Sequence, residues 1–443
     1  MQMEMALPMV RTKCLLVLAL VFALVVTGCS VDTMRAANVT STSATLAADV
    51  QCSPNEAGQV WWELREAGAP TWQTVSAKRD VSCAPGGLDN VQVSNDVTGL
   101  KPGGRYEFRL AAQAPAGGPV VYTNSTGFST QGGFSPGLVS SANHPLSAAA
   151  AKSLGADIVR VEFDIGTSPA AMRDSIAAIA DAGARPLLLA GFDSRIPTQA
   201  EAQNLASWAS TYGPGGSFWA DRSDGRLAVQ QIEFGNETSY GYQFGDGWSD
   251  QSYADRARAY ATRFAQAAYA IAGSGDKVGL LAQADDGGSG SANWVDNMFA
   301  AVPNLDDLVD GWTVHPYGPR DSWKAKLDRL IAQTAAHGAA ATIPIDVTEY
   351  GLSSDNGSAL TNNYGWPTNQ TYDQAAAALN ASVGEMRFDP AIGPRLRLFM
   401  IYAAHDLSPS RANTERERYF GVLRNDLGEK GAYSAAVRGL FAP

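Results

Sequence analysis

The chain shows two successive patterns of hydrophobic and polar positions. In the first part, short stretches rich in β-branched and aromatic residues are separated by Gly- and Pro-rich turns. The expected strands in this part include 43–52, 58–68, 72–77 and 105–115. Short strands at regular spacing are typical of a sandwich, so residues 38–130 are predicted to form an all-β sandwich domain.

The second part of the chain alternates apolar, strand-like runs with helical stretches. Eight strands are expected, at 133–140, 157–165, 184–192, 228–236, 277–283, 309–318, 343–351 and 395–405. Each precedes an expected helix, at 145–155, 168–183, 198–211, 252–273, 291–302, 322–338, 371–387 and 432–441. Continuous apolar runs are typical of strands buried on both faces, and their alternation with helices predicts a parallel sheet with right-handed crossovers.

Eight such repeats predict an α/β fold, a (β/α)8 TIM barrel over residues 131–443. An open doubly wound sheet is the alternative. It is disfavoured because no Gly-rich phosphate-binding loop follows the first strand. The Gly- and Ser-rich stretch 125–137 marks the boundary between the two domains.

The N-terminus has the pattern of an export signal. Two basic residues precede an apolar run at 15–26, which is shorter than a membrane-spanning helix and has the length of a secretory signal core. The following "TGCS" resembles the lipobox of bacterial lipoproteins. The resemblance implies that residues 1–28 are a signal peptide, that Cys29 is lipidated and anchors the protein to the membrane at the bacterial cell surface, and that 29–37 is a tether. An ordinary signal peptide that contains a cysteine is the alternative.

Composition narrows the possible partners. Hydrophobic residues make up 45% and charged residues 17% of the 443 residues, which is typical of a globular protein. The net charge of −11 argues against nucleic acid as a partner. The four histidines show no metal-ligand spacing, and the acidic stretch 285–290 is interpreted as a turn, so neither a metal nor a cofactor is expected. We expect a monomer.

The cysteines divide between the leader and the first domain. Of the four, Cys14 lies in the signal and Cys29 is the expected anchor. The remaining Cys52 and Cys83 are expected to form a disulfide, because they are an even pair in an exported chain. Two unpaired thiols are the alternative.

The segment "VTGLKPGGRYEFRLAAQ" (97–113) resembles the corner of a fibronectin type III domain, where a leucine, a turn and a tyrosine lead into a core strand. The resemblance implies that Tyr106 is the corner tyrosine and that Trp61 or Trp62 is the core tryptophan. Modules of this kind are usually spacers or docking surfaces.

Polar residues gather at the carboxyl ends of the expected barrel strands, where active sites of this fold lie. They are Arg160, Glu162, Asp164, Asn236, Glu237, His315, Tyr317, Glu349, Tyr402, His405 and Asp406. Glu237 and Glu349 follow the fourth and seventh strands, so both can point into one central cleft. Paired carboxylates in such a cleft are typical of glycoside hydrolysis, in which one donates a proton and the other attacks the anomeric carbon or activates water.

The barrel resembles the retaining glycoside hydrolases of the (β/α)8 superfamily called clan A. The resemblance rests on "GNE" after the fourth strand, "HPY" after the sixth and "TEYG" after the seventh, and on the closing segment 419–440. It implies that Glu237 is the acid/base and Glu349 the nucleophile. It also implies that Asn236 hydrogen-bonds the sugar 2-hydroxyl.

The same resemblance assigns supporting roles to three further residues. His315 and Tyr317 are expected to orient the two glutamates, and Arg160 is expected to keep the nucleophile ionised by charge pairing. Glu162 and Asp164 are further cleft candidates, although loops above a barrel are polar in any case.

One feature departs from the resemblance. Many relatives end the eighth strand with a tryptophan under the catalytic subsite, whereas this chain has "MIYAAHDLSPS". Tyr402 or His405 is expected to take that place. Trp248 and Trp366, in long polar loops, are expected to stack on sugar rings, with packing within each loop as the alternative.

The sequence therefore predicts a surface-anchored retaining β-glycosidase whose partner is a polysaccharide or oligosaccharide. A non-catalytic carbohydrate-binding protein on a barrel scaffold is the alternative. Transglycosylation, with a sugar as acceptor in place of water, is a third possibility.

Overall fold

The computed structural model describes residues 30–52, 57–82, 89–114, 117–130, 132–141, 146–240, 243, 251–284, 293–358, 370–409 and 415–441. The chain forms two compact units. The first covers Met1–Gly99 and Arg105–Phe128, and the second covers Leu100–Gly104 and Ser129–Pro443. None of the described helices combines the length and the apolar composition needed to cross a membrane.

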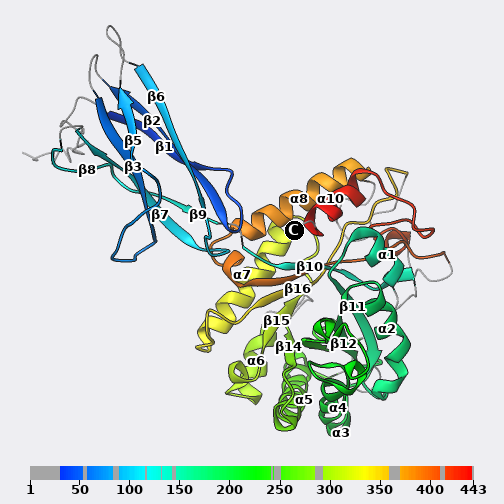
Figure 1. Cartoon of the computed structure of the whole chain (residues 1–443). Helices are drawn as coiled ribbons and strands as arrows, with labels where there is room; N and C mark the ends of the chain where they lie inside the picture. Colours follow the sequence, from blue (N-terminus) through cyan, green and yellow to red (C-terminus); the bar gives the residue numbers. More distant parts are fainter. Residues whose placement is uncertain are drawn as a thin grey trace, which may run out of the picture. The chain divides into compact units, whose positions relative to one another are not determined.

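The first unit consists of two antiparallel β-sheets (Figure 1). One sheet has the order β1-β2-β6, from β1 (Ser30–Ala37), β2 (Ser43–Cys52) and β6 (Asp89–Thr98). The other contains β3 (Ala57–Glu66), β4 (Gln73–Thr74), β5 (Arg79–Ser82), β7 (Arg105–Gln113), β8 (Val121–Tyr122) and β9 (Thr126–Ser129). Ser30–Ala37 thus pair with β2 within the stretch that the sequence analysis treats as a tether.

Aromatic residues of β3 and β7 lie in the core of this unit. Trp61, Trp62 and Tyr106 are all buried, and the Trp62 ring centroid lies 5.7 Å from that of Phe108. Trp61 is covered by the ammonium group of Lys78, 4.5 Å from its ring centroid. The fibronectin type III assignment remains a prediction. The expected disulfide lies outside the described residues, because Cys83 and the Cys52 side chain are not among them.

The second unit is a closed barrel of eight parallel strands in sequence order. Its strands are β10 (Ser135–Val139), β11 (Ile158–Asp164), β12 (Arg185–Gly191), β13 (Gln231–Phe234), β14 (Gly279–Gln283), β15 (Gly311–Val314), β16 (Ile345–Tyr350) and β17 (Leu396–Ile401). Closure between β10 and β17 confirms the predicted eight-stranded barrel and excludes the open doubly wound sheet.

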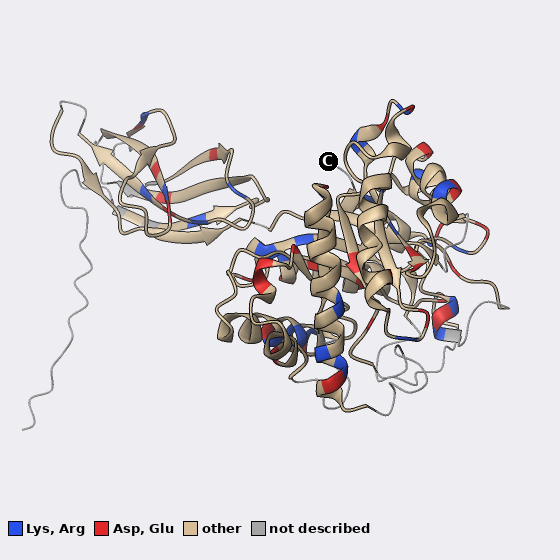
Figure 2. Ribbon diagram, turned by 90° about the horizontal axis from the view of Figure 1, so that it is seen from below, with Lys and Arg blue, Asp and Glu red and all other residues tan. Residues whose placement is uncertain are grey.

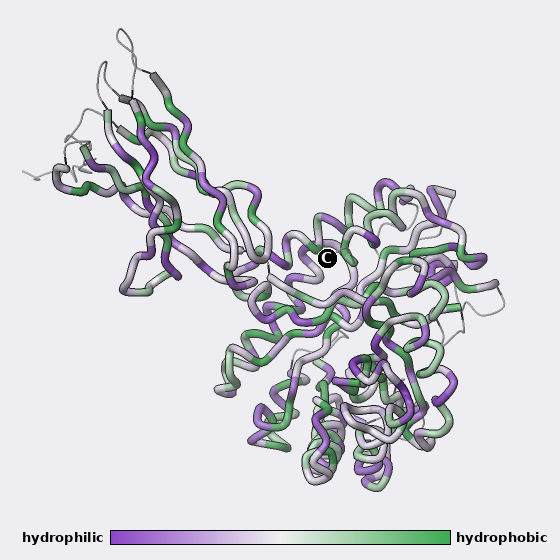
Figure 3. Tube along the Cα trace, in the orientation of Figure 1, coloured by the Kyte–Doolittle hydropathy of each residue, from purple (hydrophilic) through white to green (hydrophobic). Residues whose placement is uncertain are grey.

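Helices surround the strands (Figure 1). They are α1 (Leu146–Leu154), α2 (Arg173–Asp181), α3 (Gln199–Gln203), α4 (Leu205–Tyr212), α5 (Tyr253–Ser274), α6 (Trp294–Ala301), α7 (Arg320–Ala336), α8 (Tyr372–Phe388), α9 (Glu415–Arg418) and α10 (Ala432–Phe441). Hydrophobic and hydrophilic positions alternate along them, as expected for helices with one buried face (Figure 3). Acidic and basic residues are interspersed over the barrel's helices and loops (Figure 2).

The longest of these helices, α5, shows how the sequence specifies such an element. The Ser252 side chain accepts a hydrogen bond from the backbone N–H of Asp255 and caps the first turn. Gly275 ends the helix in the left-handed conformation, with a φ of 80°. Tyr260, Phe264 and Ile271 follow one face and are buried. That face is the one that packs on the barrel.

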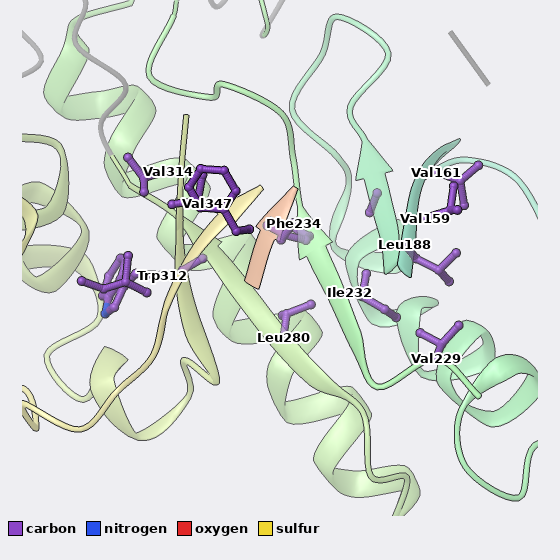
Figure 4. Packing of buried hydrophobic residues seen from close by; sticks show 14 of the residues in the cluster. Val159, Val161, Leu188, Val229, Ile232, Phe234, Leu280, Trp312, Val314 and Val347 are labelled. Carbon is purple, nitrogen blue, oxygen red and sulfur yellow. The ribbon is translucent and has the colours of Figure 1, made fainter. Parts of the chain in front are cut away.

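Alternate residues of each strand face the helices or the barrel interior, because successive side chains of a strand point to opposite faces. The outward layer includes Val159, Val161, Leu188, Ile232 and Phe234 (Figure 4). An apolar layer fills the interior with Val139, Ile158, Leu187, Leu281, Leu398 and Met400. In β11, Ile158 and Arg160 are two positions apart and therefore point to the same face. The side chain of Arg160 thus faces the barrel interior as well.

Candidate active site

The two predicted catalytic glutamates lie together at the carboxyl edge of the barrel. Glu237 is in the segment that follows β13, Glu349 is the penultimate residue of β16, and His315 directly follows β15. One carboxylate oxygen of Glu237, one of Glu349 and a ring nitrogen of His315 all lie within 4.8 Å of one another. Residues from three strands thus converge on one small space.

The backbone after β13 turns sharply to present Asn236 and Glu237. Gly235 and Glu237 both have left-handed conformations, with φ of 79° and 44°. A Cβ on Gly235 would lie 2.5 Å from Cγ2 of Thr238 and 2.9 Å from the Phe192 ring, so only glycine fits. A left-handed conformation at a non-glycine residue such as Glu237 costs on the order of 1–3 kcal/mol and is typical of functional sites.

Arg160 joins three of the site's elements. Its Nε donates to Oε2 of Glu233 at 2.6 Å, its Nη1 to Oε1 of Glu349 at 2.6 Å, and its Nη2 to Oδ1 of Asn236 at 2.9 Å. Burial alone would lower the pKa of Arg160, but the charges of Glu233 and Glu349 outweigh it and raise that pKa above its usual value. A planar guanidinium is suited to this forked geometry, which a lysine could not reproduce.

Glu349 receives hydrogen bonds on both carboxylate oxygens. Arg160 donates to Oε1, and the Tyr317 hydroxyl donates to Oε2 at 2.8 Å. Burial, followed by the charge of Glu349, raises the pKa of Tyr317 well above its usual value, so its hydroxyl keeps its proton and remains a donor. The Glu349 side chain is 10% exposed, against 22% for Glu237. Glu349 is therefore held more firmly, and Glu237 is more accessible to a ligand.

His315 is fully buried and lies beside three glutamates. Its Nδ1 is 3.2 Å from Oε1 of Glu237 and 3.5 Å from Oε2 of Glu349. Its Nε2 is 3.8 Å from Oε1 of Glu233. The imidazole thus separates the two candidate catalytic carboxylates from the charge beneath them.

Glu233 is a member of the site that the sequence analysis did not single out. It is fully buried within β13, accepts from Arg160, and accepts from Oγ1 of Thr348 at 2.8 Å. Burial would raise the pKa of Glu233, but Arg160, and after it His315, hold that pKa at about 2. The available signal was a charged residue between Ile232 and Phe234 in an apolar strand.

Glu417 is a second residue that sequence reasoning missed. It comes from the short helix α9, accepts from Arg416 Nη2 at 3.0 Å, and lies 3.4 Å from the Tyr402 hydroxyl. Burial raises the pKa of Glu417, and the charge of Glu349 acts in the same direction. Burial, followed by the charges of Glu349 and Glu417, also raises the pKa of Tyr402.

Tyr402, Tyr317 and Phe420 form an aromatic wall beside Glu349. The ring centroids of Tyr402 and Phe420 are 5.3 Å apart, and Tyr317 lies 5.9 Å from Phe420 and 6.3 Å from Tyr402. Of the two residues expected in place of the tryptophan, Tyr402 is the one at the site. His405 is buried elsewhere, with Nδ1 2.8 Å from the carbonyl oxygen of Asp406 and its N–H bonded to Ser141.

The remaining candidates lie at the rim or outside the described residues. Glu162 is exposed, yet partial removal from water raises the pKa of its carboxyl, and Glu349 and Glu233 add to that effect. Asp164 uses Oδ1 to accept from the backbone N–H of Gly166 at 2.7 Å, which makes it part of a turn. Trp248 and Trp366 lie outside the described residues.

Within the part of the chain that the structure describes, Glu237, His315 and Glu349 are the one set with ligand atoms spaced for a metal ion. Both Glu349 oxygens already accept hydrogen bonds, and the Arg160 cation lies 2.6 Å from one of them. A dication would face this fixed positive charge at close range, so the arrangement favours a carboxylate pair over a metal centre.

Comparison with known proteins finds similarity only to solved structures. No protein-family model and no curated protein matches the chain. A Bacteroides uniformis β-glucuronidase matches with a TM-score of 0.45 and 14% identity, over 93% of this chain and 49% of its own. The chain thus spans about half the length of that enzyme.

Two further solved structures are similar. A family 39 glycoside hydrolase from Bacteroides cellulosilyticus WH2 has a TM-score of 0.44 and 14% identity, over 91% of this chain and 82% of its own. Two fungal β-1,4-galactanases have a TM-score of 0.48 and 13% identity, over 69% of this chain and 99% of theirs. At such scores the function has to be argued from the site itself.

Proposed function

We propose that the barrel is a retaining glycoside hydrolase that cleaves β-glycosidic bonds in a polysaccharide or oligosaccharide. The observation that carries the proposal is the convergence of Glu237 and Glu349, with carboxylate oxygens within 4.8 Å, at the carboxyl edge of the strands. Retaining enzymes hold their two carboxyl groups about 5–5.5 Å apart, whereas inverting enzymes need about 6.5–9.5 Å to admit a water molecule. The close approach of one oxygen from each carboxylate is consistent with the shorter, retaining arrangement and supports direct attack by a carboxylate.

The different environments of the glutamates support different roles. Glu349 accepts hydrogen bonds on both oxygens, which hold its carboxyl group in place for attack on the anomeric carbon. Glu237 is the more exposed of the two, and its Oε1 lies 3.2 Å from Nδ1 of His315, so it is suited to reach a leaving oxygen. Glu237 is therefore the acid/base in the proposed mechanism.

Asn236 is oriented toward the substrate by Arg160. Its Oδ1 accepts from Nη2 of Arg160, which fixes the amide so that Nδ2 is the outward atom. No described residue accepts a hydrogen bond from that Nδ2. The amide can therefore donate to a hydroxyl of the bound sugar, an interaction that strengthens in the transition state.

The reaction proceeds in two displacements. In the first, an oxygen of Glu349 bonds to the anomeric carbon while Glu237 gives its proton to the departing glycosidic oxygen. In the second, Glu237 takes a proton from water, the water oxygen bonds to the anomeric carbon, and Glu349 leaves as a carboxylate. Arg160 and Tyr317 stabilise that carboxylate at both stages through the hydrogen bonds that they already donate.

The first test is hydrolysis of a panel of aryl β-glycosides and polysaccharides. Wild type should release sugar from at least one of them, and Glu349→Gln should lower kcat by several orders of magnitude with an unchanged melting temperature. Equal background release by both proteins would favour the non-catalytic binding protein. Analysis of products by mass would reveal transfer to a sugar in place of water.

A second test separates the two glutamates by azide rescue. With an aryl glycoside, azide should restore turnover of Glu349→Ala and give the α-glycosyl azide, because azide then replaces the nucleophile. With Glu237→Ala it should give the β-glycosyl azide, because azide then replaces water on the glycosyl-enzyme. The same anomer from both variants, or an inverted first product in wild type, would contradict the assignment.

A further inference from the structure

A second polar pocket lies at the same edge of the barrel, outside the catalytic cluster. It has a volume of about 430 Å³ and is formed by segments that follow β16 and β17 and by the segment before α10. The residues that give it its chemistry are Asp355, Tyr372, Asp406, Arg418, Tyr419 and Arg424. Its volume is at the lower end of the range for small-ligand sites, about 300–1,000 Å³.

Asp406 gives the pocket a buried carboxylate. Its side chain is 8% exposed, and its Oδ1 accepts from Lys430 Nζ at 2.7 Å and from the Gly421 N–H at 3.0 Å. No described residue donates to Oδ2. Burial raises the pKa of Asp406 to about 6, against the opposing effect of Lys430. A carboxylate oxygen without a donor, on a nearly buried side chain at a pocket wall, is a feature that a ligand hydroxyl would satisfy.

Two guanidinium groups also line the pocket. Within the described residues Arg418 makes no ion pair, and its nearest ring is that of Tyr419, 5.1 Å from the guanidinium carbon. Arg424 forms a long ion pair with Asp426, 3.4 Å from Nε to Oδ1, and its side chain is 54% exposed. The pocket therefore offers donors as well as acceptors.

The charges around the pocket balance. Asp355, Asp406 and Asp426 supply three carboxylates, and Arg418 and Arg424, with Lys430 behind Asp406, supply three cations. An anionic ligand would meet the carboxylates and a cationic ligand the arginines, so neither has a net attraction. Among the described residues, the set with ligand atoms spaced for a metal ion is Glu237, His315 and Glu349, and the three aspartates do not belong to it.

We propose that this pocket binds one neutral sugar unit of a polysaccharide while another part of the polymer occupies the catalytic cleft; this inference rests on the proposed function. Asp406 and Asp355 accept hydrogen bonds from sugar hydroxyls, and Arg418 and Arg424 donate to ring or hydroxyl oxygens. Tyr372 and Tyr419 provide aromatic surface for the pyranose ring. The pocket and the cleft lie on one face, because Asp355 follows β16 and Asp406 follows β17.

The test compares a small and a large substrate. Arg418→Ala and Arg424→Ala remove donors from two parts of the pocket, and Arg258→Ala on α5, with a side chain 50% exposed, is the matched control. We expect each pocket variant to raise KM for the polysaccharide about tenfold. It should leave kcat/KM for an aryl glycoside unchanged, because that substrate occupies only the cleft. The control should behave as wild type on both.

Each outcome decides between the two proposals. If aryl glycosides are hydrolysed and the pocket variants match wild type on polysaccharide, the pocket inference is overturned and the proposed function stands. If no glycoside is hydrolysed, binding of the same polysaccharides is measured by affinity electrophoresis. Weaker binding of the pocket variants then supports the pocket alone, and equal binding, or none, overturns it together with the proposed function.

Discussion

At the scale of single residues, His315 couples the titrating groups of the site. It lies within 3.8 Å of oxygen atoms from Glu233, Glu237 and Glu349. A change of charge at one of these groups is felt by the others, because they lie so close together. Among the three glutamates, Glu233 is the one that cannot touch substrate, because it is fully buried. Its contribution can therefore be measured apart from binding.

Replacing Glu233 with Gln keeps the size of the side chain and removes the charge beside Arg160. Arg160 then keeps Glu349 as its remaining ion-pair partner, and the loss of the nearby negative charge makes Glu349 a weaker nucleophile. We expect kcat for an aryl glycoside to fall about ten- to a hundredfold. The acidic limb of the pH–rate profile should move to lower pH.

The matched control for Glu233→Gln is Thr348→Val. It removes one hydrogen bond from an uncharged donor to Glu233 and keeps the charge of Glu233, so the acidic limb should not move. If that limb stays in place in Glu233→Gln as well, Glu233 has only a structural role.

The same residue makes a prediction about stability. The pKa of Glu233 in the folded protein, about 2, lies below its ordinary value of 4.5. Its charge therefore stabilises the fold above about pH 4.5, and this contribution is lost as the pH falls toward 2. The difference in melting temperature between wild type and Glu233→Gln should shrink from about pH 5 to about pH 3.

At the scale of elements, α5 holds the end of the strand that leads into the catalytic segment. The buried hydroxyl of Tyr260 donates to the carbonyl oxygen of Phe234 at 2.8 Å and accepts from the N–H of Gln283 at 2.7 Å. One helix thus fixes the ends of β13 and β14. The left-handed turn at Gly235 and Glu237 comes directly after the Phe234 carbonyl that Tyr260 holds.

Replacing Tyr260 with Phe should loosen that connection. The change leaves a buried carbonyl and a buried N–H without their partner, and we expect a loss of about 1–3 kcal/mol in the free energy of unfolding. We expect kcat to fall a few-fold, because Glu237 is less well positioned. Tyr269→Phe on the same helix is the control, since that side chain is 56% exposed. Equal effects of the two changes on kcat would contradict this role of α5.

The sequence predicted the elements better than their ends. The fourth and sixth strands were expected at 228–236 and 309–318, whereas β13 and β15 are Gln231–Phe234 and Gly311–Val314. The periodicity of apolar residues does not show at which residue the hydrogen bonds between strands end and a turn begins. For the same reason His405 was placed at a strand end, although β17 ends at Ile401 and the residue lies buried beyond it.

The candidate site was predictable where its residues follow strands. Asn236, His315 and Tyr317 stand in short motifs at strand ends, and the structure brings them together around Glu349 and Arg160. Glu233 was missed because the search covered the ends of strands and not their interiors. Glu417 was missed because its proximity to Tyr402 depends on the path of the chain after the last strand, which no periodicity encodes.

At the scale of the whole molecule, the expected lipid anchor is testable without knowledge of the substrate. Cys29 lies outside the described residues, so the anchor rests on the "TGCS" motif alone. In a bacterium with lipoprotein processing, Cys29→Ser should move the protein from the membrane fraction to the soluble fraction and remove the mass of the lipid. Cys14→Ser, in the expected signal, is the control and should leave the distribution unchanged.

The fork of Arg160 has a consequence for how such an enzyme could diversify. The planar guanidinium links side chains of β11, β13, β16 and the segment after β13, so the direction of Glu349 cannot change without disturbing Glu233 and Asn236. A lineage that took up a new polymer would have to leave this plane untouched and rebuild the loops above it. The reaction would then stay the same while the substrate changes, because Arg160 is kept and only the loops are altered.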